Sequence, residues 1–114
     1  MLILSRKECA VLPLVLTAKW YDMIDKGGKR EEYRLDTPYW RKRIDNWLAK
    51  DAPYKVVSFS REHRQVGMYW HADVYRRTPQ MPGFVHTDWG EDMYLHAAEG
   101  YWALKLLGRV QWDP

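Results

Sequence analysis

Hydrophobic residues recur with the spacing of an α-helix in two parts of the chain, and the first part is residues 18–26. The i, i+3, i+4 and i+7 positions of one helical face are held by Trp20, Met23, Ile24 and Gly27. Thr17 precedes this run and is a suitable N-cap residue, because its hydroxyl can accept a hydrogen bond from the first turn. The pattern predicts a short amphipathic helix, ended by Gly27 and Gly28.

The second helical pattern follows Asp36-Thr37-Pro38 and has the clearest periodicity in the chain. Thr37 is the expected N-cap, Pro38 suits the first helical position, and the helix should end before Pro53. Its i, i+4, i+7 and i+8 positions are held by Trp40, Ile44, Trp47 and Leu48. From the two helices together, the residues predicted to be substantially buried are Trp20, Ile24, Trp40, Ile44 and Trp47.

A period of two predicts strands at residues 54–61 and 65–77, joined by a hairpin loop at 62–64. One face of the second strand should carry Val66, Met68, Trp70, Ala72 and Val74. The apolar run 11–16 is predicted as a short first strand, in which Pro13 suits an edge position.

The last third of the chain gives weaker signals. Residues 78–92 contain several Pro and Gly residues and are predicted to be mostly loop, and residues 93–99 have no clear pattern. Residues 101–107 fit a helix or a strand by composition, and residues 109–112 are predicted as a short last strand.

Composition fits one folded domain spanning residues 1–114. Hydrophobic residues make up 46 % of the chain, which argues against intrinsic disorder. Seven Trp and eight Tyr are too many for all of them to be fully buried, so some aromatic rings should be available for stacking on bases. The net charge of +3 permits nucleic-acid binding without requiring it.

Several classes of site are disfavoured by the sequence. Cys9 is the single cysteine, so no disulfide can form within the chain, and a cytoplasmic location is expected. No run is long and apolar enough for a transmembrane helix, and no membrane association is expected. The histidines lack ligand spacing and there is no nucleotide-binding glycine motif, so neither a metal site nor a cofactor is expected.

Charged residues converge in the segment 27–34, which reads Gly-Gly-Lys-Arg-Glu-Glu-Tyr-Arg. If a strand begins near Arg30, Glu32 and Arg34 share one face, while Glu31, Tyr33 and Leu35 share the other. Lys29 would lie in an exposed turn and could lean toward the Glu32 and Arg34 face. Such a cluster can hold a phosphate or polarise a carbonyl, although charges after a glycine turn are also typical of a solvated edge strand.

This segment fits the pattern G-x-K-x-x-E-x-R through Gly27, Lys29, Glu32 and Arg34. It resembles the signature of the ASCH domain (activating signal cointegrator homology), a small relative of the RNA-binding PUA domains. Residues 14–26 resemble the strand and helix before that signature, and residues 101–110 resemble the closing strands. The likeness thus covers most of the chain and favours a strand at 101–107.

The resemblance and the periodicities together imply an α+β domain. We expect a small, PUA-like, mostly antiparallel sheet of five or six strands, curved or barrel-like, with two main helices against it. The implied partner is RNA or a nucleotide-like ligand, bound through Gly27, Lys29, Glu32 and Arg34.

A hydrolase acting on RNA or on an acylated nucleoside through the same cleft is the alternative. In some ASCH-like proteins a lysine, a threonine and a glutamate are implicated in such hydrolysis. Lys29 matches that lysine, whereas Glu32 stands where the threonine would fall, which argues against the same mechanism. If the protein is an enzyme, Lys29 and Glu32 are the expected catalytic residues.

The expected roles within the cluster follow from its geometry. Lys29, on an exposed turn, should contact the ligand and contribute little to stability. Arg34 should contact phosphate or orient Glu32, and Glu32 should fix the two cations or accept a proton.

Overall fold

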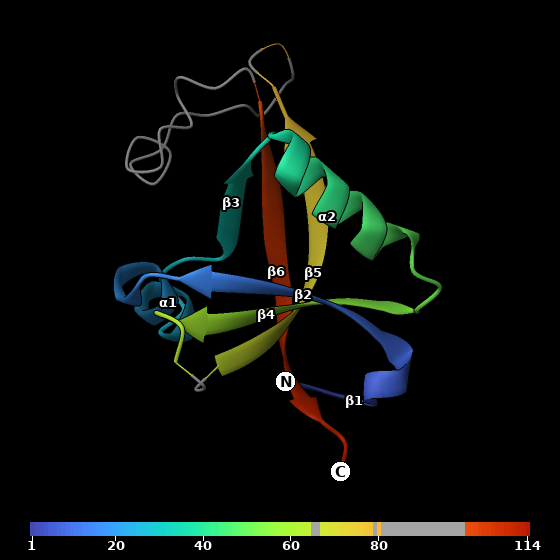
Figure 1. Ribbon diagram of the computed structural model, residues 1–114. Coiled ribbons are helices and arrows are strands. Elements are labelled where there is room, and N and C mark those ends of the chain that lie inside the picture. Colours follow the sequence, from blue (N-terminus) through green and yellow to red (C-terminus); the bar gives the residue numbers. More distant parts are fainter. Residues whose placement is uncertain (65–66, 79, 81–99) are drawn as a thin grey trace.

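The computed structural model describes residues 1–64, 67–78, 80 and 100–114. Two α-helices and six strands form an α+β domain with one mixed sheet (Figure 1). In chain order the elements are β1 (Leu2–Leu4), the short 3-10 helix η1 (Arg6–Glu8), β2 (Cys9–Leu16), α1 (Ala18–Asp25), β3 (Glu31–Leu35), α2 (Pro38–Ala49), β4 (Tyr54–Arg61), β5 (Gly67–Arg77) and β6 (Tyr101–Trp112).

Strand β6 is the centre of the sheet. One of its edges pairs with β5, and its other edge pairs first with β3 and then with β1. The sheet continues from β5 to β4 and ends at β2, which pairs with β4 in parallel. In Figure 1, β2 and β4 run across the long β5 and β6 strands.

The sheet differs from the expected mostly antiparallel, barrel-like one. The β1–β6 and β2–β4 pairings are parallel, so the sheet is mixed. Among the described residues its pairing path is open, because the terminal strands β1 and β2 do not pair with each other. The α+β class, the six strands and the two main helices are confirmed.

The C-terminal strands expected at 101–107 and 109–112 are one continuous strand. Gly108 pairs with His71 and Leu106 pairs with Ala72, so Leu107 is an extra residue at a bulge. Residues of β6 before and after the bulge both pair with β5, so the strand continues through Gly108, where the sequence predicted a break.

Strand β2 is an edge strand, as Pro13 predicted, although it begins two residues earlier than expected. Side chains donate hydrogen bonds to its backbone carbonyls: Trp47 Nε1 to Ala10 O at 2.9 Å and an Arg43 nitrogen to Pro13 O at 2.9 Å. These bonds tie α2 to the sheet and cover an edge that could otherwise pair with another chain.

The main core lies between the helices and the sheet. Ile24, Ile44 and Trp47 are at most 2 % exposed, which confirms three of the five predicted core positions on the helices. Met68 and Ala72 are buried and Trp70 and Val74 pack against the same core, which confirms the predicted face of β5. Trp20 and Trp40 are only half-buried, and Leu48 is 42 % exposed.

Some predictions lie wholly or partly outside the described residues. These are the start of the strand at 65–66, most of the loop at 78–92 and the segment 93–99.

Candidate functional site

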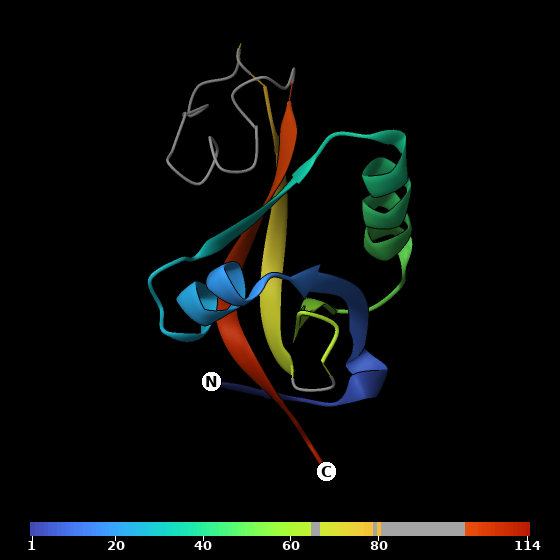
Figure 2. The ribbon, with the colours of Figure 1, turned by 60° about the vertical axis from the view of Figure 1, so that its left-hand side comes forward.

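The glycine pair after α1 ends the helix in the way the sequence predicted. Gly27 has a φ of +83°, the left-handed conformation that glycine adopts without steric cost. Gly28 N donates to Met23 O at 2.9 Å and Gly27 N donates to Ile24 O at 3.1 Å, which is the Schellman arrangement. This reversal leads the chain directly into β3, which then connects α1 to α2 (Figure 2).

Strand β3 alternates its side chains as predicted. Glu32 and Arg34 approach each other, with Arg34 Nη1 3.3 Å from Glu32 Oε2. Glu31 and Tyr33 also contact each other, through a 3.1 Å hydrogen bond from the Tyr33 hydroxyl. The strand thus separates an acidic and basic pair from a second polar network.

Glu32 is a fully buried carboxylate held between two cations. Its Oε1 accepts hydrogen bonds from Lys29 Nζ at 3.0 Å and from Tyr33 N at 2.8 Å. Its Oε2 lies 3.3 Å from Arg34 Nη1 in an ion pair and accepts no hydrogen bond among the described residues. The ion pair with Arg34 compensates the charge of this oxygen, and its hydrogen-bonding capacity is used less fully than that of Oε1.

The structure contradicts the prediction that Lys29 is exposed. Lys29 is 3 % exposed, and its Nζ lies 5.3 Å from the ring centroids of both Trp20 and Tyr33. Burial lowers the pKa of Lys29 below its ordinary value, while the neighbouring Glu32 opposes this shift. The reason is tertiary: the turn after α1 places Lys29 behind β3, where it pairs with Glu32.

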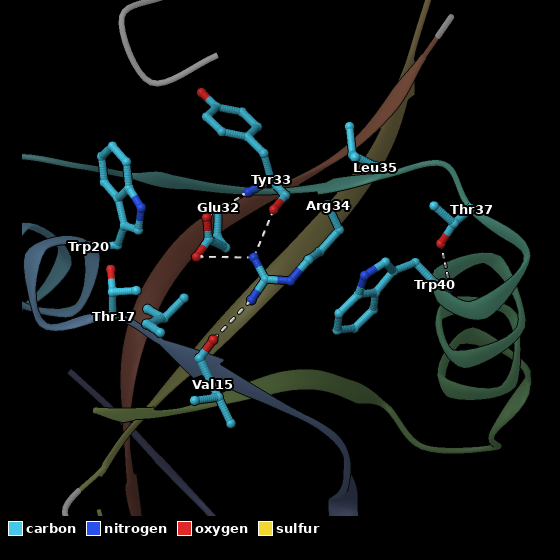
Figure 3. Close-up of a pocket in the computed structure, with 10 residues that line it drawn as sticks. Val15, Thr17, Trp20, Glu32, Tyr33, Arg34, Leu35, Thr37 and Trp40 are labelled. Carbon is cyan, nitrogen blue, oxygen red and sulfur yellow. Dashed lines mark hydrogen bonds and ion pairs between the residues drawn. The ribbon is translucent and has the colours of Figure 1, made fainter. Parts of the chain in front are cut away.

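Glu32 and Arg34 line a pocket of about 440 Å³ between β2, β3 and the two helices. Trp20 of α1 and Trp40 of α2 lie on opposite sides of it, with Arg34 between them (Figure 3). The remaining lining residues are Val15, Leu16, Thr17, Tyr33, Leu35 and Thr37. Lys29 and Gly27 do not line this pocket.

The Arg34 guanidinium is fixed in place within the pocket. It donates to Tyr33 O at 2.7 Å and to Val15 O at 3.4 Å, and its Cζ lies 5.0 Å from the Trp40 ring centroid. The quadrupole of an aromatic ring stabilises a guanidinium that lies near it. The guanidinium itself presents a planar surface. Arg34 is therefore preorganised for contact with a flat or anionic ligand.

Sequence reasoning missed the part that Trp20, Trp40 and Thr17 play in this pocket. It assigned both tryptophans to the core and Thr17 to a helix cap. Thr17 makes no capping hydrogen bond through its side chain and lines the pocket instead, whereas Thr37 accepts from Trp40 N as predicted. Helical periodicity identifies an apolar face but cannot tell a core ring from a ring that lines a pocket.

The described part of the chain lacks two other classes of feature. There, no three His, Cys, Asp or Glu side chains are grouped so that they could hold a metal ion. None of the helices within these residues has the length and apolar character to cross a bilayer.

Comparison with known proteins gives no relative from which a function could be transferred. No protein-family model matches the chain, no curated protein matches it, and no solved structure matches it.

Proposed function

We propose that this chain is an ASCH-like, PUA-related domain that binds RNA or a nucleotide-like ligand by taking one base into the 440 Å³ pocket. The pattern formed by Gly27, Lys29, Glu32 and Arg34 supports this assignment, together with the α+β class of the fold. The pocket is of the size that holds small ligands, so a single nucleoside fits it better than a duplex does.

The observation that carries the proposal is the Glu32 carboxylate in the pocket wall, whose Oε2 is in an ion pair with Arg34 and accepts no hydrogen bond among the described residues. Bases present amino and imino N–H groups, and one of these would satisfy the buried carboxylate oxygen. Arg34 offers a planar guanidinium on which a base can stack, and Trp20 offers an aromatic ring on the other side. Lys29 does not line the pocket, but its bond to Glu32 holds the carboxylate in place. Gly27 forms the turn that positions Lys29 for this bond.

The test is a titration of the protein with a mixed-sequence single-stranded RNA and with the four free nucleosides, at low and moderate salt. We expect binding of the RNA to weaken as salt rises, because phosphate contacts release counterions. The Arg34→Lys variant keeps a cation beside Glu32 but loses the planar fork, and it should bind at least about tenfold more weakly.

The matched control is Arg64→Lys, an exposed position outside the pocket, which should bind as the wild type does. Absence of RNA and nucleoside binding at low salt would refute the proposal. So would an Arg34→Lys variant with unchanged affinity.

Hydrolysis of an acylated nucleoside or of RNA is the second candidate, and the same oxygen favours it. A carboxylate oxygen that accepts no hydrogen bond can accept a proton from an attacking water. Thr17 also supplies a hydroxyl to the pocket, although not at position 32, where the family pattern would place a threonine. Incubation with acylated nucleosides and short RNAs tests this: product that is lost in a folded Glu32→Gln variant favours an enzyme, and no product from the wild type excludes these substrates.

A further inference from the structure

Two arginines are anchored next to each other on β2, one inside the pocket and one beyond it. Arg34 donates to Val15 O at 3.4 Å (Figure 3), and Arg43 of α2 donates to Pro13 O at 2.9 Å. The two carbonyls are two residues apart on one strand, so they point to the same edge. Their separation is roughly 6.6 Å, since a strand rises about 3.3 Å per residue.

Trp40 connects the two arginines. The Cζ atoms of Arg34 and Arg43 each lie 5.0 Å from the centroid of the Trp40 ring. Trp40 lines the 440 Å³ pocket and Arg43 does not, so Arg43 lies at the rim of the pocket beside this ring. Arg43 is therefore placed to contact a part of the ligand that extends out of the pocket past Trp40.

Arg43 has donors and a charge available for such a contact. It is partly exposed, and its guanidinium uses two of its five N–H donors, one on Pro13 O and one on the Tyr39 hydroxyl at 3.2 Å. Among the described residues it forms no ion pair, whereas Glu32 opposes the charge of Arg34. A guanidinium that is held in place and has donors left suits a phosphate group.

Tyr39 adds an exposed aromatic ring beside Arg43. It is 61 % exposed, and its ring centroid lies 5.6 Å from Arg43 Cζ and 5.0 Å from the Trp40 centroid. These two neighbours restrict the ring, so a base that stacks on it orders little further side-chain motion. Exposed aromatic rings beside basic groups are the surfaces on which the bases of a single strand stack.

We propose that Arg43 and Tyr39 form a second subsite, which holds the next nucleotide of a single-stranded RNA whose base occupies the pocket. Arg43 donates to the phosphate that joins the two nucleotides, and the Tyr39 ring stacks on the second base. The spacing of the anchored arginines suits a base beside Arg34 and the adjoining phosphate beside Arg43. The inference rests on the proposed function and makes the ligand a dinucleotide or a longer chain.

The test compares a short mixed-sequence single-stranded RNA with the four free nucleosides, by calorimetric titration of the full chain. The wild type should bind the RNA more tightly than any nucleoside. Arg43→Gln can still donate to Pro13 O but lacks the charge, so it should bind the RNA about fivefold more weakly. The slope of log affinity against log salt should fall by about 0.7, the value for one phosphate contact on a single strand.

The matched control is Lys42→Gln, which removes the same charge from the neighbouring, exposed residue of α2 and should bind the RNA as the wild type does. Nucleoside affinity should be unchanged in Arg43→Gln, because Arg43 does not line the pocket. That unchanged affinity also shows that the variant is folded.

The stacking half of the subsite is tested at Tyr39. Tyr39→Ala should weaken RNA binding about tenfold and leave nucleoside binding unchanged. Tyr39→Phe should bind the RNA nearly as the wild type does, because it keeps the ring and loses only the hydroxyl.

Three outcomes would overturn the second subsite alone. The first is a wild type that binds nucleosides but binds the RNA no more tightly. The second is unchanged RNA affinity in Arg43→Gln and Tyr39→Ala. The third is an equal loss of RNA and nucleoside binding in these variants, because they would then act through the pocket. A wild type that binds neither ligand would instead refute the proposed function, and this inference with it.

Discussion

At the residue scale, one buried carboxylate organises the candidate site. Glu32 is 0 % exposed, and a buried ionised group is tolerated when opposite charges and hydrogen bonds compensate for its lost hydration. Lys29 and Arg34 supply those charges from two directions, and the Tyr33 backbone adds a donor. The motif residues therefore form one unit, in which Lys29 supports Glu32 and Arg34 faces the pocket.

The first prediction concerns the stability that Lys29 supplies. Lys29→Met removes one of the two cations that compensate Glu32, so it should lower the free energy of unfolding by about 3 kcal/mol. Urea denaturation followed by circular dichroism measures this change. Lys42→Met is the control, because Lys42 is exposed on α2, and it should leave the midpoint unchanged. Equal stability of Lys29→Met and the wild type would mean that Arg34 alone balances the carboxylate.

The pH dependence of the same pair of proteins gives an independent check. Burial lowers the pKa of Lys29 below its ordinary value of 10.5, so in a window below 10.5 the folded protein binds fewer protons than the unfolded chain does. In that window the titration of Lys29 makes the unfolding free energy of the wild type rise with pH. Lys29→Met has no titrating group at this position and lacks this contribution. The stability difference between the two proteins should therefore widen as pH rises toward 10.5; a narrowing difference would mean that the pKa of Lys29 is raised.

At the scale of elements, the turn between α1 and β3 decides where the motif side chains lie. The two Schellman hydrogen bonds end the helix within one turn of Ile24, which anchors α1 in the core at 0 % exposure. Gly27 of the motif thus acts through backbone geometry, because it does not line the main pocket.

The second prediction tests this turn. Gly27→Ala forces a side chain into a left-handed residue with φ +83° and should cost about 1 kcal/mol of unfolding free energy. Gly28→Ala is the matched control, because its added Cβ would meet Met23 O at an ordinary 3.7 Å and its φ is not in the left-handed region. Thermal melting of both variants measures the difference, and equal melting temperatures would show that the conformation of Gly27 is not limiting.

At the scale of the whole molecule, Asp36 joins elements that are distant in the sequence. It lies between β3 and α2, and its side chain is 6 % exposed. Its carboxylate accepts hydrogen bonds from Arg41 at 3.2 Å, from Arg76 of β5 at 2.7 Å and from Trp102 Nε1 of β6 at 3.2 Å. These bonds fix the corner from which α2, and with it Trp40, is placed over the pocket.

The third prediction is that Asp36→Asn destabilises the whole domain by about 2 kcal/mol, because a neutral amide replaces a carboxylate that serves three donors. Although burial opposes the shift, Arg41 and Arg76 hold the pKa of Asp36 below its usual value. The stabilisation is therefore present above the ordinary pKa of 3.8 and is lost as pH falls below it.

Urea denaturation from neutral to acidic pH checks the Asp36 prediction, with the exposed Asp113→Asn as control. The gap between Asp36→Asn and the wild type should close at the acid end. A gap that is constant with pH would contradict the ionic part of the argument.

The sequence by itself determined the features that depend on neighbouring residues. The caps at Thr37 and Gly27, the alternation of Glu32 and Arg34 on β3, and the edge position of the strand with Pro13 all follow from local backbone chemistry. These features are readable because each depends on residues within about one helical turn or one strand.

Only the tertiary structure decided which of these residues meet and which are buried. The sequence placed Lys29 on the surface, yet packing of α1 against the sheet buries it behind Glu32. The parallel pairing of β2 with β4 and the continuous β6 depend on partners far along the chain. Trp20 and Trp40 are brought to one pocket by the same long-range packing, which no local period encodes.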